Sequence, residues 1–390
     1  LSAIQNNRAI FVLWAITGKL DAPGAIYLNA KGLETPKLFE IPEDDKPIGV
    51  DEFPLFYKFS GQGQFSRFPK AVLEDEPYPV RGLMILGGSP VLSFPDSKSW
   101  REAYKKLDCL IVLDRYFTED ARYADVVFPA CSLFEVPKAV PGPEGPHIVE
   151  PLIEPVGESK NDVLIMGAIA KKLGFGDKLP QTEEELRSWL LSGTAPYAGD
   201  FGTSADQKKE KHYKKYETGE LRADGKPGFP TPSGKLEICS TILEENGFVP
   251  YPEYKDVRSI PGLAGKEYPF TMTSGARSNN RMGVFGANLD KIAEIEPYPF
   301  VDINAEDAKE IGIKDGDMVK VITPFADGTF KAKIRGIARH AIHIPHGGGS
   351  AYMAEPWKNG NVNDLCSLDY ADPMTGFVLI KSVPCRVEKV

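Results

Sequence analysis

The chain has 390 residues, a length that can bury a large hydrophobic core and that favours two domains. Hydrophobic residues make up 42% and charged residues 26%, the balance of an ordinary globular protein. The net charge of −9 argues against nucleic acid as a partner, because duplex binding draws its affinity from lysine and arginine that neutralise phosphates. The sequence contains no apolar run of about 18 residues, so no segment is expected to span a membrane.

The chain starts at Leu1, with no methionine and no charged segment followed by an apolar core. We therefore expect a fragment, a processed product or part of a longer protein. The cysteines are scattered, without a C-x-x-C spacing, which predicts free buried thiols in place of a zinc or iron–sulfur site. They are Cys109, Cys131, Cys239, Cys366 and Cys385.

The first predicted element is a helix over residues 8–17, capped by Asn6 or Asn7 and ended by Gly18. Residues 29–79 are rich in proline, glycine and phenylalanine, which predicts a long ordered loop with one short helix near residues 70–73. Within this segment, residues 61–64 (GQGQ) have no strand before them and no Lys-Ser/Thr after them. We interpret them as a turn and not as a phosphate loop.

Three short apolar runs follow, over residues 83–86, 109–113 and 126–128. Between the first two, Asp96 or Ser97 can cap a helix. Its apolar side chains recur every three or four residues and form one stripe. This pattern predicts a βαβ unit with parallel strands buried on both faces. The stripe consists of Trp100, Ala103, Tyr104 and Leu107.

The ends of these strands carry residue types that suit a ligand. Gly87, Gly88, Ser89 and Pro90 follow the first strand, where glycines allow close approach and free N–H groups can face phosphate oxygens. Asp114 follows the second strand, where its carboxylate can accept N–H donors from a guanine edge or bond a ribose hydroxyl. Ligands collect beyond the carboxyl ends of such strands. No G-x-G-x-x-G is present, so a tight turn with an incidental acid explains the pattern equally well.

Two helices are predicted next. The first covers residues 163–173, with Asn161 or Asp162 as its N-cap, and the second runs from the capping box of Thr182 and Glu185 to about Leu191. Residues 199–228 then turn polar and charged, with lysine runs at 208–211 and 214–215, which predicts a solvated insertion.

The final third predicts a small barrel of short strands. A strand is expected over residues 270–274, a helix over 305–311 capped by Asn304, and strands over 318–323 and 329–334. Asp327-Gly328 predicts the hairpin turn between the last two strands.

His340, His343 and His346 are candidate metal ligands because of their close spacing. Strand alternation puts His340 and His343 on opposite faces, so the three cannot converge while the strand persists. We expect His346 and the glycines at 347–349 to line a substrate funnel or touch a cofactor, with a packed or solvent-facing histidine as the alternative.

The order of these motifs resembles the molybdopterin oxidoreductases, the dimethyl sulfoxide reductase superfamily. Residues 5–25 (QNNRAIFVLWAITGKLDAPGA) are similar to the family run NG-x-x-RAI…LTGN-x-x-x-PGG, and residues 87–90 (GGSP) to its GGNP loop. Residues 112–129 (VLDRYFTEDARYADVVFP) resemble the family pattern D-x-x-x-T-E-T-x-x-x-ADVVLP. The chain departs from these patterns at Ala25, where a second glycine is usual, at Ser89, where asparagine is common, and at Asp120, where threonine is usual.

The resemblance implies an α/β Rossmann-like domain with a parallel sheet over residues 1–262, including the insertion, followed by a molybdopterin dinucleotide-binding β-barrel of the double-psi type over 263–390. Asp162 matches an acidic residue near the guanine end, residues 273–280 (TSGARSNN) a TGR loop, Asn363 an amide facing a pterin, and Lys381 a late basic residue. The implied cofactor-binding residues are Gly87, Gly88, Ser89, Pro90, Asp114, Arg115, Thr118, Asp162, Thr273, Ser274, Gly275, Arg277, Asn279, His346, Asn363 and Lys381.

The resemblance further implies the C-terminal half of an enzyme that holds molybdenum or tungsten on two molybdopterin guanine dinucleotides. The metal ligand and a [4Fe-4S] cluster would lie in an N-terminal half, with an iron–sulfur electron-transfer subunit as a further partner. Family-level resemblance favours the thiosulfate and polysulfide reductase-like branch, whereas the substrate and the compartment, cytoplasm or periplasm, stay open. A nicotinamide-dependent dehydrogenase and a non-catalytic cofactor-binding module are the alternatives.

Overall fold

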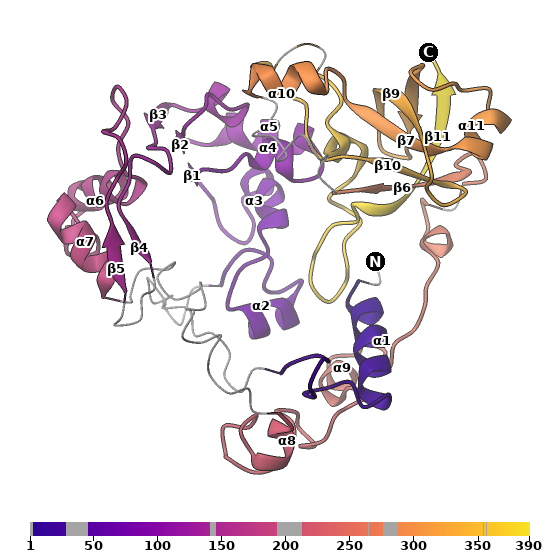
Figure 1. Ribbon diagram of the computed structural model, residues 1–390, viewed down its shortest axis with the longest axis horizontal. Coiled ribbons are helices and arrows are strands. Elements are labelled where there is room, and N and C mark those ends of the chain that lie inside the picture. The colour runs from indigo at the N-terminus through magenta and orange to yellow at the C-terminus, as the bar shows by residue number, and fades with distance from the viewer. Residues whose placement is uncertain are drawn as a thin grey trace.

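The computed structural model describes residues 3–28, 46–140, 146–192, 213–263, 265–275, 288–353, 355 and 357–390. In that part the strands form a three-stranded sheet, a closed six-stranded barrel and a two-stranded hairpin. Figure 1 shows the three-stranded sheet and the barrel on different sides of the molecule, with C-terminal loops between them.

The predicted parallel sheet is confirmed, in the order β1-β2-β3. Leu86 of β1 pairs with Leu113 of β2, and Asp114 of β2 pairs with Pro129 of β3, so all three strands end at one edge. The expected burial on both faces is most complete in the central strand β2. Leu86 of β1 and Val126 of β3 are exposed, because these two strands lie at the edges of the sheet. The strands span β1 (Gly82–Leu86), β2 (Cys109–Asp114) and β3 (Val126–Pro129).

The predicted helix after β1 is also confirmed, as α5 (Ser97–Lys106). Asp96 caps it by accepting a hydrogen bond from the Ser99 N–H, at 3.2 Å. Trp100 on its apolar stripe is fully buried and stacks on Phe68 of α3 (Phe68–Glu74), with ring centroids 5.6 Å apart. One further short helix, α4 (Pro90–Ser93), begins directly after the GGS turn and was not predicted.

The first 79 residues contain more helix than the sequence predicted. Helix α1 spans Ala3–Ile16, so Asn6 and Asn7 lie inside it and do not cap it. The Asn7 side chain donates to the Ala3 carbonyl within the first turns. The expected loop contains α2 (Pro54–Ser60) in addition to α3, and Gly61 ends α2 with a φ of 66°. Residues 61–64 therefore form a turn, as predicted.

Helices α6 (Asp162–Lys172) and α7 (Glu183–Leu191) follow the hairpin of β4 (Lys138–Val140) and β5 (His147–Val149). Asn161 caps α6 by accepting from the Val163 N–H at 2.9 Å. The capping box of Thr182 and Glu185 is formed as predicted.

The described end of the expected insertion departs from the prediction of a solvated segment. Lys215, at the start of α8 (Lys215–Thr218), is buried and forms an ion pair with buried Asp21. Its ammonium also lies 3.7 Å from the centroid of the Tyr27 ring. Residues 193–212, including the first lysine run, are outside the described part. The segment 231–238 forms turns without a strand and leads to α9 (Thr241–Glu245).

The predicted barrel is present and closed, in the strand order β10-β6-β11-β8-β9-β7. Pairs β6–β10 and β7–β9 are parallel, and the other pairs are antiparallel. Asn304 caps α11 as expected. The elements are β6 (Phe270–Ser274), α10 (Asp290–Ile295), β7 (Phe300–Asn304), α11 (Ala305–Glu310), β8 (Met318–Ile322), β9 (Asp327–Arg335), β10 (Ala341–Ile344) and β11 (Lys381–Lys389).

The predicted hairpin turn at Asp327-Gly328 is misplaced. Both residues already belong to β9, and Asp327 pairs with Ile322. The turn lies at residues 323–326, where Thr323 accepts hydrogen bonds from the Phe325 and Ala326 N–H groups at 3.2 Å. Pro324 follows Thr323, and its fixed φ suits the first central position of a turn.

The C-terminal chain joins the barrel to the parallel sheet. Trp357 and Met353 belong to the same buried cluster as Trp100 and Val112. The Trp357 indole N–H donates to the Glu296 carbonyl at 2.7 Å, so one side chain contacts both parts.

All five cysteines are free, but only Cys366 and Cys385 are buried; Cys109 and Cys239 are exposed. Burial raises the pKa of Cys366 and of Cys385 to about 12. In the described ranges, every helix is too short or too polar to cross a bilayer.

Candidate functional site

The loop after β1 has the geometry of an anion-binding turn. Gly87 has a φ of 60°, and a Cβ placed there would meet nothing within 4 Å, so the space before it is open. Its own N–H donates to the Leu113 carbonyl at 2.9 Å. Among the described residues, the N–H groups of Gly88 and Ser89 have no hydrogen-bond acceptor. Two adjacent free donors at a strand end suit a phosphate oxygen.

The base of this loop is a buried carboxylate that the sequence did not single out as a site residue. Asp120 accepts hydrogen bonds from the Ser89 hydroxyl, from the Val91 N–H at 3.2 Å and from the Tyr104 hydroxyl at 2.7 Å. Burial raises the pKa of Asp120, and the three donors oppose that shift. Burial and the nearby Asp120 also raise the pKa of Tyr104. The only sequence signal for this network was the departure of positions 89 and 120 from the family pattern.

Two half-buried carboxylates lie near one another beyond β2. Asp114 ends the strand and accepts from the Tyr116 N–H at 3.0 Å. Burial raises the pKa of Asp114, and Arg115 opposes the shift. Because Asn161 is the cap of α6, the Asp162 carboxylate is not needed for that role. Burial and the negative charge of Asp114 raise its pKa. The predicted residues Asp114, Arg115 and Asp162 therefore lie close enough for their charges to interact.

The next predicted residue, Thr118, has a structural partner. Its buried hydroxyl accepts from the Ala121 N–H at 3.3 Å and so caps the short turn that positions Asp120. Glu119 forms an ion pair with Arg122 at 2.8 Å and accepts from the Ala351 N–H at 3.1 Å. This segment thus ties the sheet to the chain between β10 and β11.

Four predicted residues of the barrel gather where β6 ends and β11 begins. Thr273 and Lys381 are paired across the two strands. The buried Ser274 hydroxyl donates to the Ile380 carbonyl at 2.8 Å. Gly275 has a φ of 100°, and a Cβ there would lie 3.9 Å from the Lys381 side chain. Arg277 and Asn279 of the same motif lie outside the described residues.

His346 and Asn363 connect this barrel end to the GGSP loop. Asn363 is buried, and its amide donates to the Leu92 carbonyl of α4 at 2.7 Å. The same amide nitrogen lies 3.4 Å from Nδ1 of His346. The structure thus brings the two predicted side chains together at the C-terminal end of α4, although part of the Asn363 amide is used within the protein.

The other two histidines of the sequence motif lie in different elements. His340 lies in the turn before β10 with a φ of 58°, so the strand alternation expected for it does not apply. His343 is in β10, and its Nδ1 lies 3.0 Å from Asp302 of β7. Among the residues with described side chains, no group of three histidine, cysteine or acidic residues is arranged to hold a metal ion.

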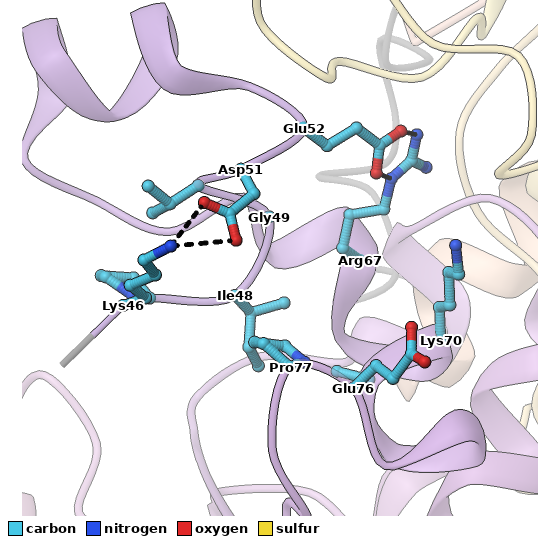
Figure 2. A pocket seen from close by; sticks show the side chains of 12 residues that line it. Lys46, Ile48, Gly49, Asp51, Glu52, Arg67, Lys70, Glu76 and Pro77 are labelled. Atoms are coloured by element: carbon cyan, nitrogen blue, oxygen red, sulfur yellow. Dashed lines mark hydrogen bonds and ion pairs between the residues drawn. The ribbon is translucent and has the colours of Figure 1, made fainter.

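A separate charged hollow lies beside α3. Figure 2 shows the Lys46–Asp51 and Arg67–Glu52 pairs in this hollow, whose volume is about 200 Å³. The ion pairs measure 3.1 Å and 2.5 Å. These charges neutralise one another, and no predicted site residue lines the hollow.

Comparison with known proteins agrees with this geometry. The family model for molybdopterin oxidoreductases matches residues 8–172, and the model for the molybdopterin dinucleotide binding domain matches residues 271–384. Together they cover the GGSP loop, both aspartates and the predicted barrel residues.

Several named relatives are similar in sequence. The F420-dependent formate dehydrogenase subunit alpha of Methanocaldococcus jannaschii is 31% identical, over 68% of this chain and 38% of the relative. Dopamine dehydroxylase of Eggerthella lenta is 25% identical, over 100% of this chain and 47% of the relative. This chain spans less than half the length of either.

The fold also matches a solved structure, acetylene hydratase from Pelobacter acetylenicus, with a TM-score of 0.71 at 20% identity. The match covers 88% of this chain and 52% of that protein. At this identity the likeness establishes the arrangement of sheet and barrel. The family models and the relatives lead to one conclusion: the chain belongs to the molybdopterin oxidoreductase family.

Proposed function

We propose that this chain holds bis-molybdopterin guanine dinucleotide, with molybdenum or tungsten, as part of an oxidoreductase. The observation that carries the proposal is the shared strand edge: free N–H groups at Gly88 and Ser89 lie at the end of β1, and the Asp114–Asp162 pair lies beyond the neighbouring strand. When bound, the pterin-held metal supplies two-electron chemistry, by oxygen-atom or hydrogen transfer.

The residues present fit this group. The turn at Gly87 leaves open space before two unused donors, which suits a pyrophosphate oxygen. Asp114 and Asp162 supply acceptors for the N–H donors of guanine. The charge of Arg115 acts on both, Thr118 would join the site through the turn that it caps, and Pro90 starts α4 behind the loop.

The barrel end would contribute the second set of contacts. Lys381 next to Gly275 offers a cation to a phosphate or pterin oxygen. Thr273, Ser274, Arg277 and Asn279 complete the motif in sequence. Beside α4, Asn363 would face a pterin, and His346 would line the approach of a substrate or touch the cofactor.

The finer assignments form part of the same proposal. The first part, residues 1–262, would be Rossmann-like, and residues 263–390 would form a double-psi barrel. A [4Fe-4S] cluster and the metal's protein ligand would be supplied outside this chain, and an iron–sulfur subunit would exchange electrons with it. The substrate is proposed from resemblance to belong to the thiosulfate and polysulfide class, and a panel that also includes formate and dimethyl sulfoxide would test it.

The test measures cofactor and guanine binding separately. Metal analysis and pterin fluorescence after acid release should detect molybdenum or tungsten and pterin in the purified protein. Calorimetry should show guanosine diphosphate binding that Asp114→Asn or Asp162→Asn weakens about tenfold, the loss expected for a hydrogen bond to a charged group. Asp108→Asn is the matched control, because Asp108 precedes the opposite end of β2 and pairs with Arg81.

Each alternative predicts a different result. Binding of NAD without binding of guanosine diphosphate would support a nicotinamide-dependent dehydrogenase and refute the proposal. Pterin binding without turnover of any substrate by the complete enzyme would support a non-catalytic module.

A further inference from the structure

Two positions at which this chain departs from its family's pattern, Ser89 and Asp120, contact each other. Ser89 replaces the common asparagine of the GGNP loop, and Asp120 replaces the usual threonine in the later motif. The positions are separated by 31 residues, yet the Ser89 hydroxyl donates directly to the Asp120 carboxylate.

Asp120 gathers donors from three neighbouring elements. Ser89 belongs to the loop, Val91 to α4 and Tyr104 to α5. The carboxylate is fully buried, and no ion pair to it exists among the described residues. A buried carboxylate without a cation depends on such donors, because an unsatisfied charge in the interior is costly. The three hydrogen bonds therefore fix the loop against α5.

The opposite end of α4 is held as well. The Asn363 amide donates to the Leu92 carbonyl at 2.7 Å, and the Asp96 N–H donates to the Asn363 carbonyl at 3.1 Å. Helix α4 is only one turn long, so its own hydrogen bonds contribute little rigidity. Contacts at both ends therefore determine where the free N–H groups of Gly88 and Ser89 point.

We propose that Asp120 is a positioning residue whose contact with Ser89 sets the phosphate-binding conformation of the GGSP loop. The proposal rests on the proposed function, because it assigns the loop to a phosphate of the cofactor. Asp120 acts through the loop and does not touch the ligand.

A double-mutant cycle tests the pair. Ser89→Asn and Asp120→Thr are made singly and together in the full chain, with guanosine diphosphate as the probe. Each single change should weaken its affinity about tenfold, the loss expected for one hydrogen bond to a charged group. Each should also speed amide hydrogen exchange of the peptide over residues 86–93. The double variant should lose no more affinity or exchange protection than Asp120→Thr alone, because both changes remove the same contact.

The matched control is Asp125→Asn. The Asp125 carboxylate accepts from the Leu110 N–H at 2.7 Å within the same sheet but has no contact with the loop. This variant should lower thermal stability without changing exchange over residues 86–93. If Asp120→Thr does not fold, Ser89→Ala and Asp120→Asn measure the same contact by exchange.

The outcomes separate the two proposals. Single variants with unchanged exchange, or a double variant whose losses simply add, would overturn the positioning role. Wild-type protein that fails to bind guanosine diphosphate would refute the proposed function, whereas the exchange cycle would still decide whether Asp120 and Ser89 are coupled.

Discussion

The ion pair between Asp21 and Lys215 gives a stability prediction of definite size. Both side chains are buried, with exposed fractions of 0% and 1%. The carboxylate also accepts from the Lys215 N–H at 2.7 Å and from the Leu28 N–H at 3.1 Å. Burial acts to raise the pKa of Asp21, but the hydrogen bonds and the charge of Lys215 outweigh it and lower that pKa.

Replacing Lys215 by methionine keeps the apolar stem and removes the ammonium. Asp21 is then left with two backbone donors and no cation. Breaking one side of a buried ion pair costs roughly 3–5 kcal/mol of unfolding free energy, because the remaining charge stays buried. The double variant Asp21→Asn/Lys215→Met removes both charges and should lose much less stability than Lys215→Met alone.

Urea unfolding followed by tryptophan fluorescence measures these free energies. Lys214→Met is the matched control: this neighbouring lysine is exposed, and its 3.4 Å contact with Glu217 lies at the surface, so its loss should be small. A loss below about 1 kcal/mol in Lys215→Met, or a double variant as unstable as the single one, would refute the reasoning.

Three further predictions follow from local structure. Trp100→Ala should cost about 3–5 kcal/mol in urea unfolding because the ring is fully buried against Phe68; a loss below about 1 kcal/mol would contradict this. Asp162 has a raised pKa in the folded state, so its contribution to stability is complete below the unfolded pKa and is lost as pH rises. The stability of Asp162→Asn relative to the wild type should therefore increase as pH rises from about 3 to neutral. A difference in melting temperature that stays constant with pH would be evidence against the raised pKa of Asp162. Thr182→Ala should lower the unfolding free energy by about 1 kcal/mol because the capping box is lost. Thr182→Ser should retain most of that stability, as thermal unfolding can check.

The sequence alone was sufficient where local chemistry decides structure. Asp96 before α5, Asn304 before α11 and the Thr182–Glu185 box were identified because a cap needs only residues a few positions apart. The parallel strands β1 to β3 followed from short apolar runs joined by an amphipathic helix. The sequence order of these strands also predicts that Asp114 and the GGSP loop share one edge of the sheet.

Only the tertiary structure revealed the contacts that join distant segments. Lys215 was expected in solvent because it lies in a charged run, but Asp21 is 194 residues away and supplies the countercharge that permits burial. Asn363 was expected to face a cofactor, and part of its amide instead bonds Leu92. Composition and periodicity do not predict such partners, because they describe only residues close together in the sequence.

The candidate site also has features that the sequence predicts and features that only the tertiary structure reveals. Its residue types and their order along the chain are local information, which motifs preserve. The Asp114–Asp162 interaction, the joining of His346 to α4 through Asn363, and the Ser89–Asp120 contact depend on how the chain returns on itself. Burial and long-range hydrogen bonding arise from the whole fold, which is why the structure was needed to identify Asp120 as the base of the loop.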